Sequence, residues 1–155
     1  MEKIEIFDFT KEIVLTVDYT KAIDELVASG NYTERNKNIN HQNLFEVPHK
    51  FIGKKVKTKI KFYHLPLIVD HNIISKAIQL EGFREANIFE FLTLGAEYPN
   101  IKYSLCTTGV EYKACYNTYK PCIFYRRRLG LVLESSCNGH FMLFVAAQEC
   151  LSDHQ

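Results

Sequence analysis

Lysine alternates with other residue types through residues 54–66, and this pattern is the clearest candidate for binding chemistry. Neighbouring side chains of a β-strand point to opposite faces of a sheet, so the lysines would share one face. The opposite, mainly apolar face would carry Val56, Thr58, Ile60 and Phe62. The predicted basic row consists of Lys55, Lys57, Lys59 and Lys61. Charges spaced about 6.6 Å apart suit phosphates or an acidic protein surface, although a solvated outer face that discourages edge-to-edge aggregation has the same pattern.

Three consecutive arginines form a second basic feature, Arg126, Arg127 and Arg128. In a strand the first and third would share a face and the second would point away. Guanidinium groups bind phosphate and carboxylate through paired hydrogen bonds. If this strand lay beside the lysine strand, the two would form one basic surface. Otherwise ordinary surface charge, with the arginine stems packed on apolar neighbours, accounts for the pattern.

The five cysteines lie in the last third of the chain and form no Cys-x-x-Cys pair. They are Cys106, Cys115, Cys122, Cys137 and Cys150. A chain of 155 residues buries a core without disulfides, so we expect free thiols that act as small hydrophobic side chains. A zinc site is an alternative, although only the last two of its four ligands have the close spacing that zinc sites favour. Those ligands would be Cys115, Cys122, Cys137 and His140.

Cysteine-dependent hydrolysis is a further alternative, because it needs a reactive thiol and a base within reach. Cys106 and Cys137 are the candidate nucleophiles. The candidate bases are His41, His49, His64, His71 and His140. No local signature of a cysteine enzyme surrounds them, and glycine-rich phosphate loops and paired acidic motifs are absent. We therefore predict no catalytic site, no metal and no cofactor.

Composition places the chain among ordinary globular proteins, with 46% hydrophobic and 24% charged residues. The 19 basic and 18 acidic residues give a net charge of +1, which leaves only local patches to attract nucleic acid. Acidic residues interrupt residues 1–19, so no apolar core of a signal peptide is present there. No run approaches the ~18 apolar residues of a membrane helix. We expect a soluble, cytoplasmic protein that makes no contact with a membrane.

Hydrophobic periodicity predicts the elements that position these residues. Strands are expected over 11–19, 54–66, 102–107, 122–128, 129–134 and 141–147. Helices are expected over 20–30, 72–81 and 88–95. Asn87 and Glu90 form a capping-box pattern before the last helix. The strand over 141–147 is apolar on both faces, which indicates a central position, and the polar residues 31–43 indicate a surface loop.

The order of these elements predicts the fold class. Helices lie in the first two-thirds of the chain and strands in the last third. This arrangement favours a single α+β domain over residues 1–155, with a mainly antiparallel sheet, about three helices and an all-strand C-terminal third.

Residues 82–100 (GFREANIFEFLTLGAEYPN) resemble a recurrent segment of a group of small, uncharacterised bacterial proteins. In that group an Arg-Pro-Ala-Thr run precedes a Leu-rich helix that ends in Gly and is followed by Tyr-Pro. Here Arg84–Asn87 stand in place of the run, while Ile88–Gly95 and Tyr98-Pro99 match the helix and the pair. The helix-then-strands ending is also similar to C-type-lectin-like domains, in which an Arg-Leu-Pro-Thr motif begins a helix. The resemblance implies a binding scaffold and no particular activity.

The expected function is therefore non-catalytic binding, as an adaptor or inhibitor, of an acidic macromolecular surface, most readily an acidic protein. The expected contacts are the four lysines of the row and the three arginines. Nucleic-acid binding through the same residues and cysteine-dependent hydrolysis are the alternatives.

Overall fold

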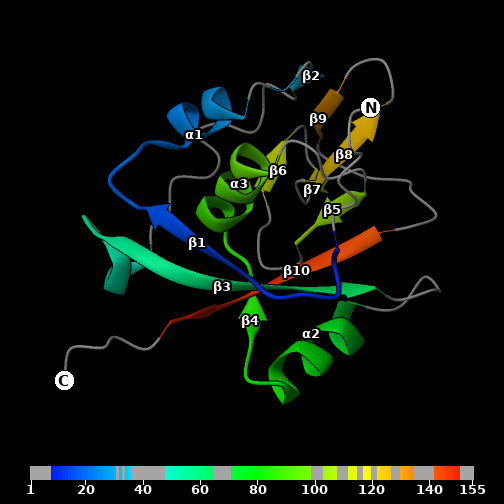
Figure 1. Cartoon of the computed structure of the whole chain (residues 1–155). Helices are drawn as coiled ribbons and strands as arrows, with labels where there is room; N and C mark the ends of the chain where they lie inside the picture. Colours follow the sequence, from blue (N-terminus) through cyan, green and yellow to red (C-terminus); the bar gives the residue numbers. More distant parts are fainter. Residues whose placement is uncertain are drawn as a thin grey trace, which may run out of the picture.

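The computed structural model describes residues 8–30, 32, 34–35, 48–64, 71–98, 103–107, 112–114, 117–119, 122–126, 130–134 and 142–150. These residues form an α+β fold in which helices lie on both faces of a sheet (Figure 1). The elements in chain order are β1 (Ile13–Asp18), α1 (Ile23–Ser29), β2 (Glu34–Arg35), the 3₁₀ turn η1 (His49–Phe51), β3 (Lys55–His64), α2 (His71–Leu80), β4 (Arg84–Glu85), α3 (Ile88–Glu97), β5 (Ser104–Cys106), β6 (Tyr112–Ala114), β7 (Asn117–Tyr119), β8 (Cys122–Arg126), β9 (Gly130–Glu134) and β10 (Met142–Glu149).

Eight of the described strands belong to one sheet, in the order β1-β3-β10-β5-β8-β9-β2, with β4 also paired to β10. Among the pairs of described strands, only β10–β5 and β2–β9 are parallel, so the prediction of a mainly antiparallel sheet is confirmed. β10 is an interior strand between β3 and β5, as the apolar run over 141–147 predicts. β6 and β7 pair separately with each other. β1 ends the sheet on one side and pairs with β3 alone among the described strands.

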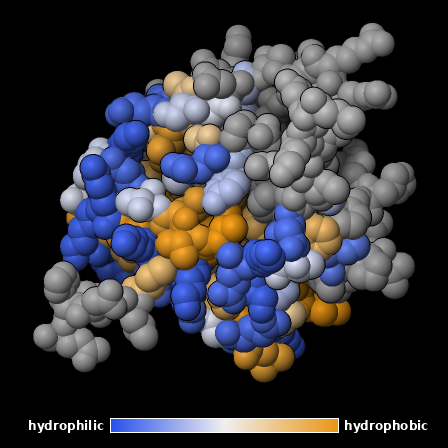
Figure 2. Space-filling view, in the orientation of Figure 1, coloured by the Kyte–Doolittle hydropathy of each residue, from blue (hydrophilic) through white to orange (hydrophobic). Residues whose placement is uncertain are grey.

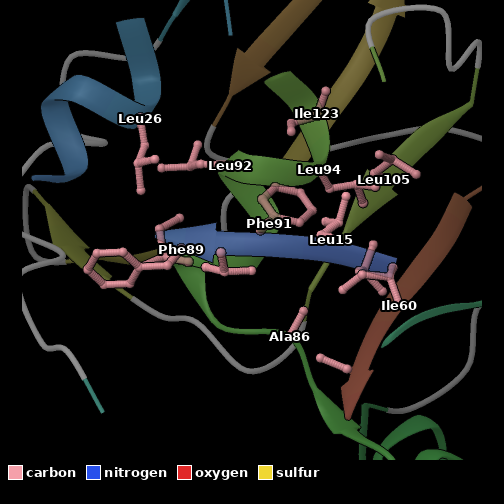
Figure 3. Close-up of a cluster of buried hydrophobic side chains, with 14 of the residues drawn as sticks. Leu15, Leu26, Ile60, Ala86, Phe89, Phe91, Leu92, Leu94, Leu105 and Ile123 are labelled. Carbon is pink, nitrogen blue, oxygen red and sulfur yellow. The ribbon is translucent and has the colours of Figure 1, made fainter. Parts of the chain in front are cut away.

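One face of this sheet, here called the closed face, is covered by α1 and α3. Figure 3 shows α3 side chains, including Phe91 and Leu94, lying against Leu15 of β1 and Leu105 of β5. Ile60 of β3 belongs to the same buried cluster. The alternation of β1 and β3 thus places most of their apolar residues against the helices, as the strand period requires.

The opposite face, here called the lysine face, is covered only in part. α2 lies on this side of the sheet, away from α1 and α3 (Figure 1). Ile74 and Ile78 of α2 are buried against Phe83 and Ala146, with the rings of Tyr63 and Phe144 at the margin. Since this small cluster involves only one end of β3, the other end of that strand keeps an exposed face.

α3 begins where the capping-box pattern predicts. The Asn87 side chain accepts a hydrogen bond from the Glu90 backbone N–H at 2.9 Å, and the Glu90 carboxylate accepts one from the Asn87 N–H at 2.9 Å. Near the other end, a Cβ at Gly95 would clash with the Tyr32 hydroxyl oxygen, so glycine permits the close packing of Tyr32 on this helix.

The predicted elements agree with the structure except where strands are very short. The three helices and the six longer predicted strands are present, and the last third of the described chain contains strands only. β2, β4, β6 and β7 have two or three residues each, too few for a period to show. The surface loop predicted over 31–43 is wrong at Glu34–Arg35, which form β2; apart from Tyr32, the rest of that stretch lies outside the described residues.

Candidate binding face

The predicted basic row lies on β3, with its side chains on the lysine face. Lys55 and Lys57 are exposed, whereas Lys59 and Lys61 are partly buried. The intervening Thr58, Ile60 and Phe62 are buried on the closed face. β3 lies between β1 and β10, so the row does not lie on an edge strand. Prevention of edge-to-edge aggregation, for which edge strands often carry lysines, therefore does not explain the row.

Lys61 differs from the other three lysines because its charge is already used within the protein. Its ammonium group forms an ion pair with Glu81, just beyond the end of α2. It also lies 5.3 Å from the ring centre of Tyr63 and 5.6 Å from that of Phe83. These contacts attach α2 to the sheet, so Lys61 belongs to the packing of the lysine face.

The remaining lysines have few acidic neighbours. Lys55 lies opposite Asp18 of β1, and its charge helps to lower the pKa of that carboxyl, although the hydrogen bonds from Thr20 lower it more. Lys57 lies opposite Thr16, and Lys59 lies opposite Val14. Among the described residues, no carboxylate oxygen lies within 4.0 Å of the ammonium group of Lys57 or Lys59. These two charges are therefore available to a partner.

Arg126 is not part of this row. β10 and β5 lie between β3 and β8, so the two basic strands are about 14 Å apart across the sheet. The pairings align His64 of β3 with Leu143, Leu105 and Ile123. Along the strand direction, Lys61 lies three residues to one side of this line and Arg126 lies three residues to the other side. The two residues are therefore also separated by about 20 Å along the strands. Arg127 and Arg128 lie outside the described residues.

A second group of charges, which the sequence did not identify as a site, lies on the closed face. Both terminal nitrogens of Arg84 donate to the Glu90 carboxylate at 2.7 Å, and the Arg84 Nε donates to Glu149 at 2.9 Å. Lys50 approaches Glu149 at 3.4 Å. Glu90 has no exposed surface. A glutamate within the largely apolar helix of residues 88–95 was the available signal, since a buried carboxylate requires a partner.

Every charge of this Arg84 cluster, defined as Arg84, Glu90, Glu149 and Lys50, has a partner inside the protein. Burial opposes the charge on Arg84, but the hydrogen bonds and charges of Glu90 and Glu149 outweigh it, so the pKa of Arg84 lies above its ordinary value. Burial also works against the Glu149 carboxylate, yet Arg84 and Lys50 hold its pKa below the ordinary value. A bidentate arginine with two carboxylates links β4, α3 and β10 and leaves no free group for a ligand.

The alternative chemistries gain no geometric support in the described residues. Cys106 is buried, Cys150 is partly buried, and neither forms a disulfide. Cys115, Cys137 and His140 lie outside the described residues, as do the side chain of Cys122 and that of His71. Across the described part of the chain, no group of three or more His, Cys, Asp or Glu residues is arranged to hold a metal ion.

A search of the described residues for membrane-spanning helices and comparisons with known proteins both gave negative results. None of the described helices is both long enough and apolar enough to span a membrane. Comparison with protein-family models, with curated proteins and with solved structures found no match. The fold and site define an α+β sheet domain with one closed face and one partly open, basic face.

Proposed function

We propose that this protein is a non-catalytic binding protein that receives an acidic segment of another protein on the lysine face. The observation that carries the proposal is the pair of ammonium groups on Lys57 and Lys59, which have no carboxylate within 4.0 Å among the described residues. Lys55 extends the same row at the exposed end of β3. An acidic partner would supply the charges that the carboxylates of the described residues do not.

Several features favour an acidic protein over a nucleic acid. The net charge of +1 provides no general field to attract a polyanion. The free part of the row contains neither arginine nor an aromatic ring on which a base could stack. Tyr63, at the other end of the strand, lies against the small cluster under α2. A row of lysines without a stacking ring therefore suits carboxylates better than bases.

Charge reversal tests the proposal. The variant Lys55→Glu/Lys57→Glu/Lys59→Glu removes the row, and the variant Lys11→Glu/Lys21→Glu/Lys76→Glu makes the same charge change at three exposed lysines outside β3. Fluorescence anisotropy with a labelled ten-residue polyglutamate, at low salt, measures binding. Three weak ion pairs of about 0.5–1 kcal/mol each predict a loss of at least about tenfold in affinity for the row variant. The matched control retains most of its affinity.

Equal loss in the two variants, or no binding of polyglutamate to the unmodified protein at low salt, would remove the proposal. A single-stranded ten-nucleotide DNA is measured in parallel. Tighter binding of the DNA than of the peptide, with a steep dependence on salt, would replace the proposed partner by a nucleic acid.

A further inference from the structure

β1, the strand beside the lysine row, forms an edge of the sheet that no other described strand covers. β1 pairs continuously with β3 over six residues, without a bulge, and its sequence, IVLTVD, contains neither lysine nor proline. Val14 is 56% exposed on the lysine face, and Thr16 beside it is also exposed. Natural edge strands usually carry a lysine, a proline or a bulge that prevents another strand from pairing. β1 has none of these devices.

The backbone groups that point outward from β1 can be identified from the pairing. The Tyr19 N–H donates to the Lys54 carbonyl at 2.9 Å, and the Cys150 N–H donates to the Lys57 carbonyl at 3.0 Å. In an antiparallel pair, alternate residues bond to the partner strand and the others point away from it. The odd-numbered residues of β1 therefore bond to β3, and the N–H and C=O groups of Val14 and Thr16 point outward. Among the described residues, no group bonds to them.

We propose that the acidic partner is an extended peptide that adds to β1 as an antiparallel strand and directs alternate carboxylates toward Lys57 and Lys59. This inference rests on the proposed function and specifies how the partner is held. Main-chain hydrogen bonds to Val14 and Thr16 give affinity, and the lysines select the sequence, as is general for strand addition.

The register explains why carboxylates would meet the lysines. A peptide residue that exchanges hydrogen bonds with Thr16 places its side chain on the lysine face, in line with Thr16 and Lys57. The residue two positions along pairs with Val14 and lies in line with Lys59. Each lies about 10 Å from its lysine between Cα atoms. The four-carbon stem of lysine and a glutamate side chain together cover this distance, because the short side chains of Val14 and Thr16 do not obstruct them.

Charge favours this peptide over a second copy of the protein. Two copies joined through β1 would bring two lysine rows toward each other. The one carboxylate that β1 carries on this face is Asp18, which already accepts hydrogen bonds from the backbone and the hydroxyl of Thr20 at 2.9 and 2.5 Å. Figure 2 shows hydrophobic residues near the centre of the visible face, with hydrophilic ones to the left and below, in the region that β1 crosses in Figure 1. This setting suits a peptide that alternates apolar and acidic residues.

Backbone methylation of a peptide tests the inference separately from its charge. The probe is a labelled octapeptide, Val-Glu-Thr-Glu-Val-Glu-Thr-Glu. One derivative is N-methylated at the glutamates, whose N–H groups would bond to β1, and the control derivative carries the same number of methyl groups on Val and Thr. We expect the first to bind at least about tenfold more weakly than the parent peptide and the control to remain within about threefold. Equal affinity of the two derivatives would overturn strand addition.

A protein variant provides the reciprocal test. Thr16→Pro removes an outward N–H and leaves the bonds of Leu15 and Val17 to β3, which an edge position tolerates, while Thr16→Val keeps the N–H. The proline variant should lose the octapeptide yet retain polyglutamate, with an unchanged circular dichroism spectrum. If the proline variant stays folded and binds the octapeptide as the valine variant does, strand addition is wrong while the lysine face remains a binding site. A concentration-dependent dimer of the unmodified protein that Thr16→Pro abolishes would assign the edge to a second copy instead. If neither peptide binds the unmodified protein, the proposed function itself falls.

Discussion

The Arg84 cluster and the lysine row place cationic side chains on opposite faces of the same sheet, with opposite outcomes. On the closed face, Arg84 meets Glu90 and Glu149, and all of their charges are compensated. On the lysine face, only Lys61 has a full ionic partner, in Glu81, and Lys57 and Lys59 have none among the described residues. The charges of the Arg84 cluster are paired within the protein, whereas Lys57 and Lys59, unpaired among the described residues, are the ones that a partner can use.

The largest expected effect concerns the closed face. Arg84→Leu leaves the fully buried Glu90 carboxylate without its counter-charge, and breaking a buried pair in this way costs about 3–5 kcal/mol in the free energy of unfolding. Urea denaturation measures the change. The contrasting variant, Lys55→Gln/Lys57→Gln/Lys59→Gln, should lie within about 1 kcal/mol of the unmodified protein, because exposed lysines contribute little. Similar losses in both variants would abolish the distinction between the two faces.

A smaller effect is the pH dependence of stability that the Glu149 carboxylate gives to the closed face. The pKa of Glu149 is lowered in the folded state, because the bonds and charges of Arg84 and Lys50 outweigh the effect of burial. The contribution of the Glu149 carboxylate to the free energy of unfolding is therefore complete above its ordinary pKa of 4.5. This contribution is lost as the pH falls through the folded-state pKa. Glu149→Gln should cost about 1–2 kcal/mol at pH 7.

Urea midpoints between pH 7 and pH 3 provide the measurement for Glu149. The difference between Glu149→Gln and the unmodified protein should shrink toward acid. A constant difference over the whole range would mean that the carboxylate charge contributes nothing and that only the shape of the side chain matters.

Local pattern was sufficient for most of the fold. The alternation through β1 and β3, the capping box at Asn87 and the apolar run of β10 each carry their signal within a few residues. Sheet order is not local: nothing in the sequence of β3 or β8 indicates that β10 and β5 separate Lys61 from Arg126. For the same reason, the pairing of Arg84 with Glu149, 65 residues away, could not be predicted from the sequence. The lysine row was found because its period is local, and the open edge beside it required the register of β1 and β3.

The smallest expected effect lies within the row itself and divides one strand into a structural and a binding part. Lys61→Ala removes the ion pair with Glu81 and the approach of the ammonium group to the Tyr63 and Phe83 rings. The Lys61 side chain is 30% exposed, so we expect a loss of about 1 kcal/mol in stability, from a screened ion pair and a weak cation–π contact. Lys57→Ala should change stability by less than about 0.5 kcal/mol and should weaken polyglutamate binding more than Lys61→Ala does. Thermal denaturation and fluorescence anisotropy of the two variants measure these effects. Equal losses of polyglutamate binding in the two variants would show that all the lysines of the row contribute alike. The contact of Lys61 with α2 would then not exclude Lys61 from binding.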